Sequence, residues 1–400
     1  MKKYLPRSTE LIAHPYQPPA GFVSVQPAVH RASTIVFKNV AAMRARKWKE
    51  KIGYSYGLHG TPTTFTLEER IATLEGGLQT LLVPSGLASI TLVDMALLST
   101  GDQVLIPDNA YGPSKEFARH ELASWGVGHA FYDPMTPASL AATITPATRL
   151  VWIEAPGSVT MEFPDITALI AIARERGITI ALDNTWGAGL AFEPFALRAE
   201  VGGETMAVDI SVQALTKYPS GGADVLMGSV TTRDEALHQV IKATHMRTGF
   251  GVGANDAELV LRALPSLPLR YEAQDRAGRT LALWWAERPE VAQVLHPALE
   301  GSPGHAHWAR LCGQAAGLFS VVFDQRYSER QVHAFVDALE LFKIGFSWAG
   351  PVSLVMPYDL AALRPGSPHR GTLVRFSLGL EDVADLIDDC VQALGALNER

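Results

Sequence analysis

Short apolar segments alternate with helical ones through the first half of the chain, and this alternation limits the possible folds more strongly than any other feature. The apolar segments are rich in Val, Ile and Leu and cover residues 80–83, 102–107, 149–155 and 178–183. Strands that are apolar throughout are buried on both faces, as in parallel sheets with helices on each side. The alternation therefore predicts an α/β fold whose large domain holds a mostly parallel sheet between helices.

The pattern changes after about residue 255. Long helical segments follow, and strand-like segments at 316–323 and 372–379 then flank a further helical segment. We expect a smaller C-terminal α+β domain, residues 256–400, beside a large domain, residues 61–255. Residues 1–60 match neither pattern, and we expect them to form an arm that packs on a neighbouring subunit.

Composition narrows the class of protein. The 400 residues carry a formal net charge of −7, and residues 43–51 form the only basic cluster, so no nucleic-acid surface is expected. We expect that cluster on a helix that faces solvent or another subunit. Cys312 and Cys390 make neither a disulfide framework nor a zinc pattern, which favours a reducing compartment, the cytoplasm, and no metal site.

No membrane association is expected either. The N-terminus lacks the apolar region of a secretory signal. The most apolar segment, residues 88–100, is short and interrupted by Asp94, which predicts a buried helix.

Residues just after the strands are the first candidates for a site, because open α/β sheets bind ligands at the carboxyl ends of their strands. The amides of Gly86 and Leu87 open a helix and could bind a phosphate, although any tight strand-to-helix turn favours glycine. Tyr111 could cover a flat ligand or pack on the core. Asp183 ends a very apolar strand and needs a partner, either a ligand or a helix N-terminus that it caps.

Lys217 stands between an apolar segment and a glycine-rich one. A loop lysine usually has no special role, but burial beside apolar groups can lower its pKa until it acts as a nucleophile or base. A phosphate turn, an aromatic ring, a buried aspartate and a reactive lysine together meet the needs of one cofactor. These positions therefore predict a pyridoxal 5'-phosphate site.

Two other motifs are interpreted as structural. Residues 249–253, GFGVG, do not join a strand to a helix as a dinucleotide loop would. His305 and His307 have no evident third metal ligand.

Longer motifs carry a resemblance over nearly the whole chain. They include YGLHGTPTTFTLEERIATLEGG (56–77), EAPGSVTME (154–162), QALTKY (213–218), FSWAGPVSL (346–354) and GTLVRFSLGLEDVADLI (371–387). The chain resembles the pyridoxal-phosphate enzymes of cysteine and methionine metabolism, and within them the lyases that act by β-elimination. The resemblance implies an amino-acid substrate and a homo-oligomer, a tetramer built as a dimer of dimers.

The resemblance also implies roles for individual residues. Lys217 matches the catalytic lysine that binds the cofactor as a Schiff base. The other matches to cofactor-binding positions are Tyr56, Gly86, Leu87, Tyr111, Asp183 and Thr216. Tyr111 and Tyr56 match tyrosines that take part in catalysis, and Tyr56 would reach in from a neighbouring subunit. The matches around the substrate α-carboxylate are Ser347, Trp348 and Arg375.

One position bears on the reaction. Relatives that act at Cγ have a glutamate where this chain has Phe346. The resemblance therefore favours β-elimination of L-cystathionine to homocysteine, pyruvate and ammonia, as in methionine biosynthesis. The alternatives are a cysteine-S-conjugate β-lyase or cysteine desulfhydrase, a γ-acting lyase or synthase, and a protein that keeps the fold without catalysis.

The chain departs from the family pattern around the cofactor phosphate. Leu58 replaces an arginine of many relatives, and His59 is either its substitute or a surface histidine. Ala214, Gly222 and Ala223 also stand where relatives often have polar side chains. We therefore expect the phosphate to have other partners.

Overall fold

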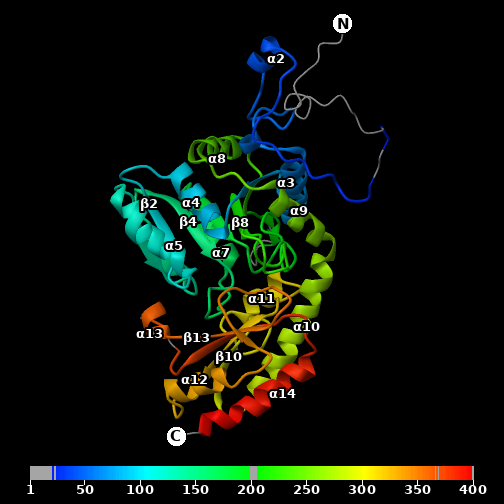
Figure 1. The fold of residues 1–400 in the computed structure, drawn as a ribbon. Helices are drawn as coiled ribbons and strands as arrows, with labels where there is room; N and C mark the ends of the chain where they lie inside the picture. Colours follow the sequence, from blue (N-terminus) through cyan, green and yellow to red (C-terminus); the bar gives the residue numbers. More distant parts are fainter. Residues whose placement is uncertain (1–19, 22–23, 199–204, 365, 368, 399–400) are drawn as a thin grey trace.

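Two large β-sheets with helices packed against them form the body of the protein, as the computed structural model shows (Figure 1), and β6 (Leu197–Arg198) pairs with β7 (Thr205–Met206) in a third, two-stranded sheet. The structure describes residues 20–21, 24–198, 205–364, 366–367 and 369–398. The larger sheet has the strand order β1-β9-β8-β5-β4-β2-β3. Its strands are β1 Gln79–Val83, β2 Gln103–Pro107, β3 Gly128–Tyr132, β4 Thr148–Glu154, β5 Thr179–Asp183, β8 Ile210–Ala214 and β9 Gly228–Thr232. Of these seven strands, β9 alone runs against the others, because it pairs antiparallel with both β1 and β8.

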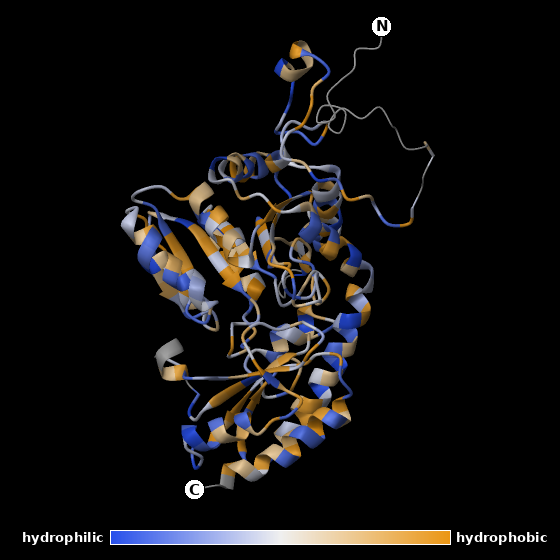
Figure 2. Cartoon of the chain, viewed as in Figure 1, coloured by the Kyte–Doolittle hydropathy of each residue, from blue (hydrophilic) through white to orange (hydrophobic). Residues whose placement is uncertain are grey.

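Helices cover both faces of this sheet. Ile153 and Leu182 belong to the apolar core beneath α7 (Ile166–Glu175), whereas Val104 and Val212 pack in the core that includes α4 (Gly86–Leu97). The residues of these strands are largely hydrophobic (Figure 2), and they pack in the cores on both faces of the sheet, which confirms the predicted α/β fold. The other helices of this half are α3 Pro62–Glu75, α5 Gly112–Phe117, α6 Pro137–Thr143, α8 Glu235–Thr248 and α9 Ala254–Ala263.

The predicted helix over residues 88–100 is α4. Its one acidic residue, Asp94, is buried and accepts a hydrogen bond from Trp152 Nε1 at 2.8 Å. Among the described helices, none has the length and apolar character needed to cross a bilayer.

The smaller sheet lies in the C-terminal part of the chain (Figure 1) and has the order β10-β11-β14-β13-β12. Its strands are β10 Val291–Leu295, β11 Leu318–Phe323, β12 Lys343–Ile344, β13 Leu354–Tyr358 and β14 Leu373–Ser377. The helices with it are α10 Leu267–Ala286, α11 His305–Leu311, α12 Glu329–Asp337, α13 Leu360–Leu363 and α14 Val383–Ala393. Trp285 of α10 is fully buried and packs its ring against Phe323, Phe335 and Phe376.

The N-terminal part stands away from this body. Figure 1 shows α2 (Val40–Arg44) at the end of an extended excursion, and residues 1–19 of the expected arm lie outside the described residues. The basic cluster at 43–51 was expected on a helix, but its helical part ends at Arg44 and turns follow. Five like charges within eight residues, from Arg44 to Lys51, disfavour a helix there because neighbouring turns would place them together.

Candidate active site

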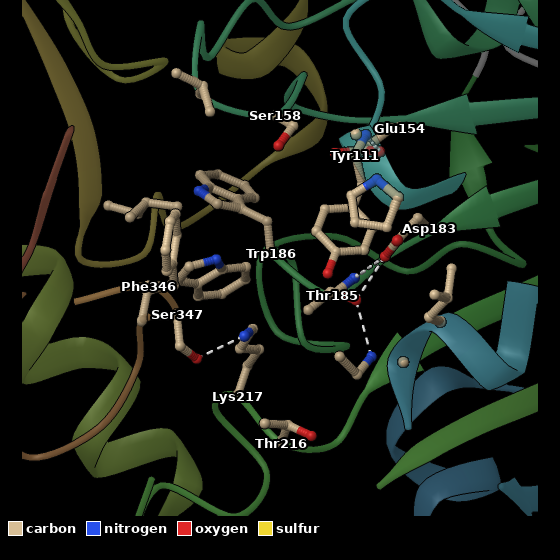
Figure 3. Close-up of a pocket in the computed structure, with 18 of the residues that line it drawn as sticks. Tyr111, Glu154, Ser158, Asp183, Thr185, Trp186, Thr216, Lys217, Phe346 and Ser347 are labelled. Carbon is tan, nitrogen blue, oxygen red and sulfur yellow. Dashed lines mark hydrogen bonds between the residues drawn. The ribbon is translucent and has the colours of Figure 1, made fainter. Parts of the chain in front are cut away.

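A deep cavity opens where the carboxyl ends of the parallel strands meet the C-terminal sheet. It has a volume of about 450 Å³ and is lined from both parts of the chain. The large sheet contributes the segments after β1, β2, β4, β5 and β8, and the C-terminal part contributes Phe346, Ser347, Trp348, Tyr358 and Arg375. Figure 3 shows Lys217, Tyr111 and Asp183 pointing into this space. Nine of the ten predicted site residues, all except Tyr56, line it.

Lys217 lies on the turn that follows β8. The turn is held by Thr216, whose hydroxyl accepts a hydrogen bond from Met227 N at 3.0 Å and donates one to Met227 O at 3.2 Å. Lys217 Nζ donates to Ser347 Oγ at 2.6 Å and lies 5.4 Å from the ring centroid of Trp348. Burial, followed by the positive charge of Arg375, lowers the pKa of Lys217 to about 8. This lysine is therefore no ordinary loop lysine.

Asp183 ends β5 beside a second carboxylate. Its Oδ1 accepts hydrogen bonds from Thr185 N and Thr185 Oγ1, at 3.0 and 2.5 Å, so the aspartate closes a turn and does not cap a helix. Glu154 ends the neighbouring strand β4 in register with Asp183. Burial raises the pKa of Asp183, and burial together with the charge of Asp183 raises the pKa of Glu154 well above its usual range. A cation placed against Asp183 would lower the pKa of its carboxyl, and the carboxylate would in turn stabilise the cation.

Tyr111 opens α5 at the edge of the cavity. Its backbone N–H donates to Glu154 Oε2 at 2.8 Å, and its side chain remains 43% exposed. Burial, then the charges of Asp183 and Glu154, raises the pKa of the phenol. The ring therefore stands free to cover a ligand, and its hydroxyl keeps its proton.

The first turn of α4 forms the end of the cavity where an anion fits. The Ser85 side chain caps Ala88 N at 3.0 Å, which leaves the amides of Gly86 and Leu87 for a ligand. A Cβ on Gly86 would lie 2.5 Å from the Cβ of Ala214, so glycine is needed where the two segments meet. The Thr216 hydroxyl would have to turn from Met227 to donate to an anion here.

Arg375 of β14 is buried on the C-terminal side. Its guanidinium lies 5.2 Å from the ring centroid of Tyr358, and one nitrogen donates to Ser347 O at 3.2 Å. Ser347 has a φ of +83°, a left-handed conformation that costs a serine of order 1–3 kcal/mol. Trp348 packs on Tyr218 with ring centroids 5.5 Å apart. The remaining guanidinium N–H groups can bind a carboxylate as a fork.

Tyr56 is not among the residues that line the cavity of its own chain. It is 48% exposed and forms an isolated bridge with Thr34. His59 accepts or donates a hydrogen bond with Ser55 at 2.9 Å and lies beside Trp48. Burial and the charge of Lys242 lower the pKa of His59, so within its own chain it is a poor substitute for an arginine.

These groups fit pyridoxal phosphate. The α4 amides suit its phosphate, Asp183 its pyridine nitrogen, Tyr111 its ring and Lys217 its aldehyde carbon. Together with the fold, they define the site of a pyridoxal-phosphate-dependent enzyme.

Comparison with known proteins also identifies a pyridoxal-phosphate-dependent enzyme. The profile of the family described as "Cys/Met metabolism PLP-dependent enzyme" matches residues 8–395, and the chain belongs to this family. It is 38% identical to a cystathionine β-lyase of Bordetella avium over 386 residues, 95% of this chain and 94% of that one. It is 35% identical to the cystathionine β-lyase MetC of Escherichia coli, covering 92% of each. Among solved structures, a cystathionine γ-synthase of Xanthomonas oryzae in complex with cystathionine is similar, with 28% identity, a TM-score of 0.84 and 94% of each chain covered. The predicted family and cofactor are thereby confirmed.

Sequence reasoning missed Glu154, Thr185 and Tyr358. The strand-end rule that selected Asp183 would also have selected Glu154, whereas the other two carry no local signal. Among the described residues no group of three or more His, Cys, Asp or Glu side chains could hold a metal ion. His305 instead begins α11, bonds Pro297 O and stacks on Trp308.

Proposed function

We propose that this protein cleaves the Cβ–S bond of L-cystathionine by β-elimination, giving homocysteine, pyruvate and ammonia. One observation carries the proposal: Lys217, with its lowered pKa, shares one cavity with Asp183 and Arg375. The similarity to lyases named for cystathionine supports the choice of substrate.

Each side chain then has a definite task. Arg375 binds the substrate α-carboxylate and so orients the Cα–H bond. Pyridoxal phosphate, when bound, supplies an acceptor for the electron pair left at Cα. Asp183 keeps the pyridine nitrogen protonated, and Lys217, as a neutral amine, removes the Cα proton. The Cβ–S bond breaks with its electrons on sulfur, and the sulfur takes a proton from Tyr111 or Lys217. The three-carbon product, aminoacrylate, is then hydrolysed by water to pyruvate and ammonia.

The mouth of the cavity favours β- over γ-elimination. Phe346 is 74% exposed there and offers neither an acid nor a base. Cleavage at Cγ requires a further proton transfer at Cβ, for which an acidic side chain at this position would be suited. We therefore expect pyruvate, not 2-oxobutyrate, from cystathionine, and release of 2-oxobutyrate alone would refute β-elimination.

The same mouth favours a second candidate, a cysteine-S-conjugate β-lyase. Leu226 is 71% exposed and lines the cavity together with Phe346, Trp186 and Met161, so an apolar S-substituent would find apolar contacts. Burying such a group contributes roughly 1–3 kcal/mol, or about 10- to 200-fold in kcat/KM. Pyruvate release from S-methyl- and S-benzyl-cysteine compared with cystathionine separates the two candidates. Phe346→Ala should selectively impair S-benzyl-cysteine, and Leu269→Ala, equally exposed but outside the cavity, is the control.

We also propose a homotetramer built as a dimer of dimers, with Tyr56 entering a neighbouring subunit's site. The N-terminal part supports this, because its apolar side chains Val36, Val40 and Ile52 are exposed in the single chain. Light scattering on a size-exclusion column measures the mass of the assembly. A monomer would refute the entry of Tyr56 into a neighbouring site, and a dimer would refute the tetramer.

The division into an arm (1–60), a large domain (61–255) and a C-terminal domain (256–400) remains our proposal, supported by the two separate sheets. We place the protein in the cytoplasm, since Cys312 and Cys390 are both free thiols.

A further inference from the structure

Arg364 follows α13 and reaches from the C-terminal part to two carboxylates on segments that follow strands β2 and β4 of the large sheet. Its Nε donates to Asp108 Oδ2 at 3.0 Å, and its Nη2 lies 2.9 Å from Oδ1 of the same carboxylate. Its Nη1 donates to Glu162 Oε1 at 2.6 Å. Arg364 and Glu162 are both more than nine-tenths buried. The fork on Asp108 and the buried contact with Glu162 together fix geometry in a way that an exposed ion pair does not.

The two carboxylates do not line the active-site cavity themselves, but each lies on a segment whose neighbouring residues form one wall of it. Asp108 lies three residues before Tyr111, and Glu162 closes the segment 157–162, which includes Ser158 (Figure 3). Asn109 ties the walls together: its Nδ2 donates to Glu162 Oε2 at 3.1 Å, and its carbonyl accepts from Ser158 N at 2.8 Å. The segments of Asp108 and Glu162 are therefore both bound by the Arg364 guanidinium.

The charges of the two carboxylates make their positions depend on the Arg364 guanidinium. Although burial opposes ionisation, hydrogen bonds led by that from His369 and the charge of Arg364 hold the pKa of Glu162 at about 2. Burial raises the pKa of Asp108 most, Arg364 lowers it, and the charges of Asp133 and Glu162 raise it further. Without Arg364, Glu162 would keep its hydrogen bonds from Asn109 and Thr160 but lose its arginine partner while a second acidic group, Asp108, stays nearby, which is unfavourable for a buried carboxylate. The two walls would then move apart.

We propose that Arg364 is a positioning residue that fixes Tyr111 over the active site by clamping the Asp108 and Glu162 walls to the C-terminal part of the chain. The inference rests on the proposed function for the role of Tyr111. Arg364 does not line the cavity and acts only through these neighbours.

The test compares Arg364→Met with a matched control in the loaded enzyme. Arg279→Met removes another bidentate arginine–carboxylate pair, Arg279 with Asp275 at 2.7 and 3.1 Å, from a place that does not line the cavity. A misplacement of about 1 Å can lower turnover about 100-fold, so Arg364→Met should lose roughly 10- to 100-fold in kcat with KM changed by less than about threefold. The visible circular dichroism of the bound cofactor should weaken in this variant and stay unchanged in Arg279→Met.

Two further variants sharpen the result. Arg364→Lys keeps the charge but not the fork and should fall between wild type and Arg364→Met, so it tests the clamp even where the methionine variant does not fold. Adding Glu162→Gln to Arg364→Met removes the unpaired charge and should recover part of the lost turnover.

Other outcomes would overturn the inference. If Arg364→Met and Arg364→Lys keep wild-type kcat and cofactor dichroism and lose only thermal stability, as Arg279→Met does, Arg364 has no positioning role. If wild-type protein releases pyruvate from no thioether, the proposed function fails, whereas the dichroism still decides whether the clamp exists.

Discussion

Lys217 should titrate near pH 8 in the protein without cofactor. Burial is the larger cause of the shift from 10.5, and Arg375 is the second, so the structure predicts two distinct responses. Wild type should show a midpoint near pH 8. Arg375→Gln should move the midpoint upward but leave it below 10.5, because burial remains.

The size of the pKa shift explains how the Lys217 amine can act as a base. At pH 7.5 a lysine with a pKa of about 8 is neutral in roughly a quarter of molecules, against roughly one in a thousand at 10.5. The site therefore supplies a few hundred times more free amine than an ordinary lysine would.

The shift also affects stability. Since the pKa of Lys217 is lower in the folded chain, the unfolded chain binds more protons between pH 8 and 10.5. Folding should thus be penalised fully below pH 8, and the penalty should fade as the pH rises to 10.5. It is at most about 3 kcal/mol, and less where water screens the partly exposed amine. Lys217→Met should accordingly stabilise the cofactor-free protein at neutral pH, as measured by urea unfolding.

Competitive acetylation measures the titration directly. Trace acetic anhydride is added over pH 6 to 11, and the peptide carrying Lys217 is quantified by mass spectrometry against that of the exposed Lys47. A midpoint above pH 10 in wild type would refute the role of burial. A midpoint that Arg375→Gln leaves unmoved would refute the role of the arginine.

Three further predictions concern the site, the assembly and the core. Asp183→Asn should lower pyruvate release at least 100-fold with an unchanged melting temperature, because an amide cannot pair with a protonated pyridine; a smaller loss would argue against that pairing. Tyr56→Phe should slow turnover without unfolding, and mixing it with Lys217→Ala after subunit exchange should restore roughly a quarter of wild-type activity, which a tyrosine acting within its own chain could not do. Trp285→Ala should destabilise folding by about 3–5 kcal/mol in denaturant titrations, and a change below 1 kcal/mol would show that this aromatic core relaxes around the cavity.

Much of the fold could be predicted from the sequence because its central strands are locally distinct. The segments that form β2, β4 and β5 are apolar enough to be predicted as strands from the sequence alone. The reversed strand β9, GSVTT, is as long as β2 and β5, but three of its five residues are Ser or Thr, and only its pairing with β1 and β8 makes it a strand. The prediction of a helix at 43–51 is wrong beyond Arg44, because repulsion among the basic side chains opposes a helix there.

The site, like the fold, contains some residues that could be predicted from the sequence and others that could not. The expectation that Asp183 and Tyr111 lie together followed from one rule about strand ends. Ser347 and Arg375 could be placed only by resemblance, since they lie more than 120 residues from Lys217. Arg364 could not be found at all, because its partners Asp108 and Glu162 are 256 and 202 residues away along the chain.

The left-handed backbone at Ser347 has a consequence for how the sequence can drift. Glycine would adopt a φ of +83° without cost, so serine is the less stable choice at this position. Its hydroxyl, 2.6 Å from Lys217 Nζ, is the group that such a replacement would remove. A lineage released from catalysis should therefore tend to acquire glycine at 347, and the residue found there in related chains would distinguish working enzymes from those that keep only the fold.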